Sequence, residues 1–167
     1  MVLVDKQDRA IGQMEKMQAH REGRLHRAFS IFLFNDAGDM LLQRRAQGKY
    51  HSPGLWSNAC CSHPRPGEPI LSAAQRRLKE EMGLECELLP AFTFSYRAEF
   101  DNGLIENEFD HVLFGFCCDN PTLNPEEADA FDYRNLSELE SELRNSPDRF
   151  TRWLAICFDR VREQLAN

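Results

Sequence analysis

The stretch GEPILSAAQRRLKEEMGL, residues 67–84, joins a glycine-marked turn to a single helix. We expect this helix to run from Pro69 to Met82, because proline is favoured at the first helical position and Gly83 marks the end. At about 100° per residue, its apolar positions fall on one stripe roughly 120° wide. The stripe contains Ile70, Leu71, Ala74, Leu78 and Met82. The pattern predicts a helix that packs against a sheet or another helix.

Two charged residues lie on or beside that apolar stripe. Glu81 falls inside it and Arg77 falls at its edge. A buried charge is costly unless it is paired or binds a metal ion. An Arg77–Glu81 ion pair at the rim of the core and a metal-binding carboxylate are both open interpretations of the helix alone.

The rest of the chain predicts strands that alternate with helices. RAFSIFLFN (27–35) is almost entirely apolar, which is typical of a strand buried on both faces. A turn at 35–39 leads into a hairpin partner, MLLQRR. Further strands are expected at 92–100, 104–118 and 131–134, a short helix at 136–145, and a last amphipathic helix opening at Ser146-Pro147. The pattern predicts one α/β (α+β) domain over residues 1–167, with a mixed sheet and a short N-terminal extension.

Composition limits the classes of function. The chain has 167 residues and a net charge of -7, which argues against general nucleic-acid binding. No apolar run reaches the roughly 18 residues that cross a bilayer, and the first residues lack the pattern of a signal peptide. Six cysteines in a chain of this length form no obvious disulfide framework. We expect a cytoplasmic monomer or weak homodimer without nucleic-acid or membrane partners.

The segment NACCSHPRPGE (58–68) brings two thiols close to an imidazole. Cys61 and His63 are two residues apart, so an extended segment would point both the same way and Cys60 the opposite way. A zinc-dependent interaction domain is one alternative, but structural zinc sites space paired cysteines by about two to four residues. A catalytic thiol beside a metal is another.

Glu106 and Glu108 in LIENEF share one face of an expected strand. Two like charges at that spacing repel, and a bound cation relieves the repulsion, whereas an exposed edge strand would leave both solvated. If histidines converge on this pair, the nitrogen and oxygen ligands would suit Zn, Mn or Fe. Sequence spacing alone does not establish that convergence.

Residues 67–84 resemble a Nudix box. The matching positions are Glu68, Arg76, Glu80, Glu81 and Gly83. Ser62 replaces the usual first glycine, and Arg77 replaces a glutamate with which Nudix hydrolases bind metal. The second departure argues against diphosphate hydrolysis.

Four more fragments narrow the resemblance to the type 1 isopentenyl-diphosphate delta-isomerases. They are RLHRAFSIFLFN, LLQRRAQGK, WSNACCSHP and IENE, and they occur in the family's order between about Lys16 and Trp153. The resemblance implies a Nudix-like α/β/α sandwich. It also implies interconversion of isopentenyl and dimethylallyl diphosphate, with a small-molecule diphosphate as the only partner.

The resemblance also implies site residues and two kinds of metal. The catalytic pair would be Cys61 and Glu108, and Tyr96 matches an aromatic position beside the hydrocarbon, where we expect it to assist Glu108 as a proton donor. The metal ligands would be His20, His26, His63, Glu106 and Glu108, holding Mn²⁺ or Zn²⁺. The Mg²⁺ that accompanies the diphosphate would be held by Glu81 and the backbone carbonyl of Cys61. The substrate would be contacted by Lys16, Arg45, Lys49, Arg77 and Trp153.

Without the resemblance, Trp153 would be a core residue and Arg45 and Lys49 an ordinary basic surface run. With it, an acid and a base on opposite sides of a flat hydrocarbon would move the double bond. We expect Glu108 to deliver the proton and Cys61 to serve the other side, although which of the two protonates stays open. A Nudix hydrolase of a small diphosphate is the alternative function.

Overall fold

The central strand β3 (His26–Phe34) organises the sheet in this computed structural model, which describes residues 1–166. Along one edge β3 pairs over its whole length with the parallel strand β8 (Ile105–Phe116), and β8 pairs with the antiparallel strand β7 (Leu88–Glu99). Along the other edge, three short antiparallel strands follow one another: β1 (Val2–Val4), β6 (Cys60–Ser62) and β4 (Met40–Arg45). The remaining strands extend this edge: β2 (Ala10–Gln13), β5 (Trp56–Asn58) and β9 (Ala128–Arg134).

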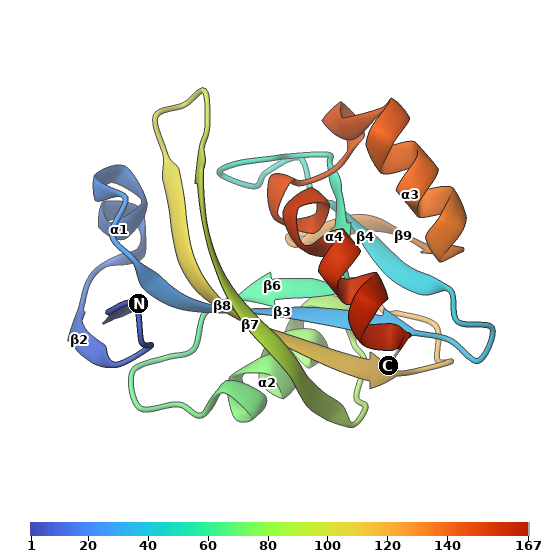
Figure 1. The fold of residues 1–167 in the computed structure, drawn as a ribbon, viewed down its shortest axis with the longest axis horizontal. Coiled ribbons are helices and arrows are strands. Elements are labelled where there is room, and N and C mark those ends of the chain that lie inside the picture. The colour runs from blue at the N-terminus through green and yellow to red at the C-terminus, as the bar shows by residue number, and fades with distance from the viewer. Residues whose placement is uncertain (167) are drawn as a thin grey trace.

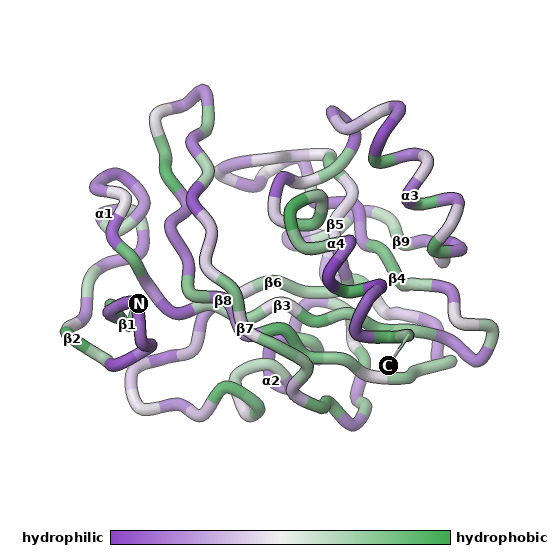
Figure 2. The backbone as a smooth tube through the Cα atoms, in the orientation of Figure 1, coloured by the Kyte–Doolittle hydropathy of each residue, from purple (hydrophilic) through white to green (hydrophobic). Residues whose placement is uncertain are grey.

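Helices cover both faces of the sheet (Figure 1). Helix α2 (Ile70–Met82) lies on one face, and α3 (Leu136–Asn145) and α4 (Arg152–Leu165) lie on the other. Each face has its own apolar core, to which β3 contributes alternate residues: Phe29, Ile31 and Leu33 on the α2 side, Phe32 and Phe34 on the α4 side. In Figure 2 hydrophobic colour follows the central strands. The predicted α/β/α sandwich with a mixed sheet is confirmed.

Several predicted boundaries need correction. Pro69 is the N-cap of α2 and lies outside the helix, with an extended ψ of 145°. The last helix does not open at Ser146-Pro147, because 147–149 form a separate 3₁₀ turn and α4 begins only at Arg152. The strand predicted at 92–100 begins earlier, at Leu88, and the strand predicted at 131–134 begins at Ala128.

Five short elements were not predicted from the sequence: β1, β2, β5, β6 and α1 (Lys16–Glu22). The N-terminal extension is therefore structured. The side chain of Glu15 caps α1 at its start, and Gly23 ends it with a φ of 60°, a conformation that favours glycine. None of the helices in residues 1–166 has both the length and the apolar character that a membrane span requires.

The apolar stripe of α2 is largely as predicted, but the assignment of Leu71 to it is wrong. Leu78 and Met82 are fully buried and Glu81 is buried with them, whereas Leu71 is 40% exposed. Ala73, which was not assigned to the stripe, is fully buried. The buried stripe is therefore centred closer to Glu81 than the prediction placed it.

This difference can be tested by matched truncations on α2. Replacing Leu78 by Ala should lower the free energy of unfolding by about 3 kcal/mol, because a buried leucine leaves a cavity. Replacing the exposed Leu71 by Ala should change it by about 0.5 kcal/mol or less. Urea denaturation of the two variants would measure both, and equal losses would contradict the observed orientation of α2.

Candidate active site

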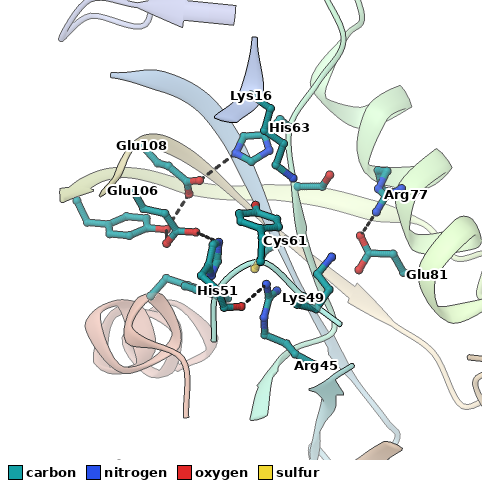
Figure 3. A pocket seen from close by; sticks show the side chains of 14 residues that line it. Lys16, Arg45, Lys49, His51, Cys61, His63, Arg77, Glu81, Glu106 and Glu108 are labelled. Atoms are coloured by element: carbon teal, nitrogen blue, oxygen red, sulfur yellow. Dashed lines mark hydrogen bonds and ion pairs between the residues drawn. The ribbon is translucent and has the colours of Figure 1, made fainter. Parts of the chain in front are cut away.

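A small cavity of about 40 Å³ lies where β6, β8 and the start of α4 meet (Figure 3). All the site residues predicted from the sequence line it except His20 and His26. His20 and His26 lie next to His63, and their ring centroids are 6.0 Å and 5.0 Å from the centroid of the His63 ring. Residues from eight helices and strands and from two loops are thus brought to one place, as the sequence analysis required.

The histidines are oriented as metal ligands. Nδ1–H of His20 donates to the backbone oxygen of Lys16, and Nδ1–H of His26 donates to that of Arg24, each over 2.8 Å. These bonds fix the tautomer and leave Nε2 of each ring as a free acceptor. Nε2 of His20 is buried without a hydrogen-bond partner within residues 1–166, and Nε2 of His26, also buried, lies 3.4 Å from Oε1 of Glu108 without forming a hydrogen bond. Such orphaned buried nitrogens are what a metal ion would satisfy.

Four of the five predicted ligands form one group. His20, His26, His63 and Glu108 offer ligand atoms that all lie within 4.8 Å of one another. Glu106 belongs to a second group with His20 and His51, and Nε2 of His51 lies 2.9 Å from its carboxylate. Imidazole and carboxylate ligands suit a divalent transition metal, so the residues present fit one.

Electrostatics keep the first group ready to bind a cation. Burial lowers the pKa of His63 to about 3, so the ring is neutral at pH 7 and loses no proton on binding a metal. Burial alone would raise the pKa of Glu108, but the imidazoles of His26 and His63 beside it bring this pKa well below its usual range. Glu108 is therefore a carboxylate.

Tyr96 links the two glutamates. Its hydroxyl lies 2.9 Å from Oε2 of Glu106 and 2.8 Å from Oε2 of Glu108, and its single hydrogen can serve one carboxylate at a time. Burial and the two nearby carboxylates raise the pKa of Tyr96 well above its usual value. The predicted same-face arrangement of Glu106 and Glu108 is confirmed, with a tyrosine between them.

The adjacent cysteines face opposite ways, as their spacing predicted. Cys60 is fully buried in the core between the sheet and α2. Cys61 lines the cavity, and its sulfur lies 3.1 Å from Oδ1 of Asn58 and 3.3 Å from Oγ of Ser30. Burial and the nearby Asp110 raise the pKa of Cys61 well above its ordinary value, so the group is a thiol at pH 7. No disulfide is formed by either cysteine, and both are free.

Basic side chains close one end of the cavity. Arg77 donates to Glu81 over 2.6 Å and to Glu127 over 2.8 Å, while Lys49 donates to Glu127 over 2.5 Å. The Arg77–Glu81 ion pair is therefore present, and both of its side chains also line the cavity. Arg45 lies over the ring of Trp153, with 5.2 Å between guanidinium carbon and ring centroid.

Sequence reasoning missed several residues of the site. They are Ser30, Tyr50, His51, Asn58, Asp110 and Glu127. Asp110 could have been found, because it continues the alternation of Glu106 and Glu108 along β8. Glu127 has no such signal, since it reaches Lys49 and Arg77 from a loop far away in the sequence.

Similarity to known proteins agrees with this geometry. The NUDIX domain family model matches residues 24–154. Isopentenyl-diphosphate Delta-isomerase 2 of Aromatoleum aromaticum is 55% identical over 96% of this chain and 85% of its own length. Isopentenyl-diphosphate Delta-isomerase of Pectobacterium atrosepticum is 51% identical over 96% of this chain and 90% of its own length.

Solved structures add support at the level of the fold alone. A crystal structure from Deinococcus radiodurans superposes with a TM-score of 0.81 at 21% identity, covering 95% of this chain and 96% of its own. A MutT protein from Methanosarcina mazei gives a TM-score of 0.68 at 17% identity, covering 86% and 96%. The alignments with the two isomerases each cover 96% of this chain. This chain therefore belongs to the Nudix family and, within it, to the isopentenyl-diphosphate Delta-isomerases.

Proposed function

We propose that this chain interconverts isopentenyl diphosphate and dimethylallyl diphosphate, with Cys61 and Glu108 as the proton-transferring pair. One observation carries the assignment: a thiol and a carboxylate from opposite edges of β3 line a single cavity. Cys61 pairs with Ser30 through β6, and Glu108 pairs with His26 through β8. Figure 3 shows the sulfur and the glutamates around the same space.

The reaction moves a double bond by one carbon. A proton is added to the terminal methylene carbon of isopentenyl diphosphate, and another is removed from the carbon next to the oxygen-bearing CH₂ group. The raised pKa of Cys61 and the lowered pKa of Glu108 give one protonated and one deprotonated group at pH 7. They favour Cys61 as the donor and Glu108 as the acceptor in this direction, the reverse of the roles expected from the sequence.

The basic end of the cavity suits the diphosphate. Lys16, Arg45, Lys49 and Arg77 all line it. Glu127 now holds Lys49 and Arg77, so a diphosphate would compete with one carboxylate for two cations that are already in position. Glu81 and the backbone carbonyl of Cys61 would hold Mg²⁺ beside the diphosphate.

A second divalent ion, Mn²⁺ or Zn²⁺, would be held by His20, His26, His63, Glu106 and Glu108. When bound, it supplies a fixed positive charge that orients Glu108 and keeps it ionised. Trp153, which is only 2% exposed, presents its ring to the cavity and would stabilise positive charge on the hydrocarbon by about 2 kcal/mol. The bound hydrocarbon would have to be shielded from water, which would otherwise trap a carbocation as an alcohol.

Hydrolysis of a diphosphate is a poorer fit to this site. Arg77 stands where Nudix hydrolases carry a metal-binding glutamate, and its guanidinium is engaged by Glu80, Glu81 and Glu127. The guanidinium of Arg77 therefore occupies the position where a hydrolase would have a metal-binding carboxylate. Proton NMR of isopentenyl diphosphate with Mg²⁺ and the protein should show the allylic isomer, whereas released phosphate would favour hydrolysis.

The two adjacent cysteines provide a matched pair of variants. Cys61→Ala should abolish isomerisation, with a loss of more than about 10³-fold in kcat, because a proton-transfer group is removed. Cys60→Ala should retain most activity and lose stability, because Cys60 lies in the core. Turnover measured by NMR and unfolding measured by urea would separate the effects. Equal losses of activity in the two folded variants would contradict the assignment.

Glu108→Gln tests the second member of the pair. The amide keeps the size of the side chain but cannot accept the substrate proton, so kcat should fall nearly as far as in Cys61→Ala. Glu99→Gln is the control, since Glu99 is exposed on β7 and contacts Arg97. A Glu108→Gln enzyme with more than about a tenth of the parent kcat would exclude Glu108 from the chemistry.

The histidine site predicts a change in metal content. His63→Ala removes a ring that lies 2.9 Å from Glu108, so divalent metal bound per chain should fall several-fold after dialysis. His111→Ala is the control, because His111 contacts Asp8 and lies outside the cavity. Elemental analysis of both variants is the measurement, and full metal content in folded His63→Ala would refute the ligand set.

A further inference from the structure

Asn58, at the end of β5, is a fully buried side chain to which neither the predicted site nor the proposed reaction gives a role. Its amide nitrogen donates to two backbone oxygens, that of Ile31 over 3.0 Å and that of Cys60 over 3.1 Å. Both amide hydrogens are thereby used. A flipped carboxamide would place its oxygen against two carbonyl oxygens, so the group has one allowed orientation.

The fixed orientation points Oδ1 of Asn58 at the cavity wall. It accepts from the thiol of Cys61 over 3.1 Å, and over 3.2 Å it shares the indole N–H of Trp153 with Oγ of Ser57, which lies 3.0 Å from that nitrogen. The hydroxyl of Ser57 adds a third contact at 3.1 Å. One oxygen atom thus contacts both the sulfur on β6 and the aromatic ring on α4.

The sulfur has a second polar neighbour, at a longer distance. Oγ of Ser30 lies 3.3 Å from the sulfur of Cys61, but its hydrogen is donated to Asp110 over 2.6 Å. The hydroxyl can therefore only accept from the thiol, at a longer distance than the amide oxygen does. Asn58 is the shorter contact, and it is the one held rigidly by backbone atoms.

We propose that Asn58 is a positioning residue, whose carboxamide fixes the sulfur of Cys61 relative to the ring of Trp153. The proposal rests on the proposed role of Cys61 and adds the group that holds it in place. A flat hydrocarbon bound between the Cys61 thiol and the Trp153 ring would react efficiently only if the distance between the sulfur and the ring is maintained. A displacement of about 1 Å at such a site can lower the rate about 10²-fold.

Kinetics of two Asn58 variants test the proposal. Asn58→Ala removes the carboxamide, and Asn58→Leu removes its polarity while preserving its volume. Both should lower kcat about 100-fold and leave KM within roughly threefold, because the basic residues at the diphosphate end are unchanged. Asn35→Ala is the control, because its amide holds only the turn between β3 and β4 and should lower stability without lowering kcat.

Alkylation reports on the sulfur itself. Without Asn58 the Cys61 side chain can adopt other rotamers, so alkylation of Cys61 by iodoacetamide should be faster than in the parent. The exposed Cys118 serves as an internal reference in the same mass spectra. Unchanged alkylation together with parental kcat in a folded Asn58 variant would overturn the proposal.

Hydrogen exchange in the unsubstituted protein keeps the test independent of how the variants fold. The side-chain amide protons of Asn58 should exchange far more slowly than those of exposed asparagines, because both are bonded to buried carbonyl oxygens. Exchange at the rate of an exposed amide would overturn the proposal. If Cys61→Ala retained activity, the proposed function of Cys61 would fail instead, while exchange and alkylation would still report on Asn58.

Discussion

The pairing register of β3 is the constraint on which the site depends. His26 lies opposite Glu108, and Ser30 lies opposite Cys61 on the other edge. Side chains alternate between the two faces of a strand, so a slip of one residue would exchange every group between the core and the cavity. In such a slip Cys60 would face the cavity and Cys61 would enter the core. The pairing of β3 with β8 over its whole length holds this register in place.

The second constraint is the cost of buried polar groups. The cavity wall contains carboxylates, a thiol, an amide and several imidazoles, most of them nearly inaccessible to solvent. Such groups destabilise a fold unless each finds a partner, and a partly satisfied network is worse than an apolar core. Here the backbone supplies many of the partners, as with the carbonyl oxygens that receive His20, His26 and Asn58. The folded chain thereby fixes the orientation of the reactive side chains before any substrate is bound.

Much of this arrangement could be predicted from the sequence, for physical reasons that differ from one element to another. The run of apolar residues in β3 and the two-residue spacings of Cys61 with His63 and of Glu106 with Glu108 each imply a face of a strand. The resemblance to a known family then assigned roles that spacing alone left open. The roles of individual site residues remain predictions to be tested by the variants described above.

The failures also have physical causes. Strands of three residues, such as β5 and β6, are too short for any periodicity to be visible, and α1 has only seven residues. Periodicity gives the angular width of an apolar stripe but not which turns of the helix are covered, and so Leu71 was misplaced. Glu127 and Asn58 act through contacts between distant segments. No local pattern contains that information.

The tautomers of His20 and His26 have a consequence for the stability of the whole chain. Each ring leaves a buried nitrogen without a hydrogen-bond partner among residues 1–166, at a cost of about 1–3 kcal/mol per group. An ion that ligates the native state alone recovers this free energy by mass action, and does so more strongly as its concentration rises. An ion bound at the proposed site would therefore raise the melting temperature of the protein as its concentration increases.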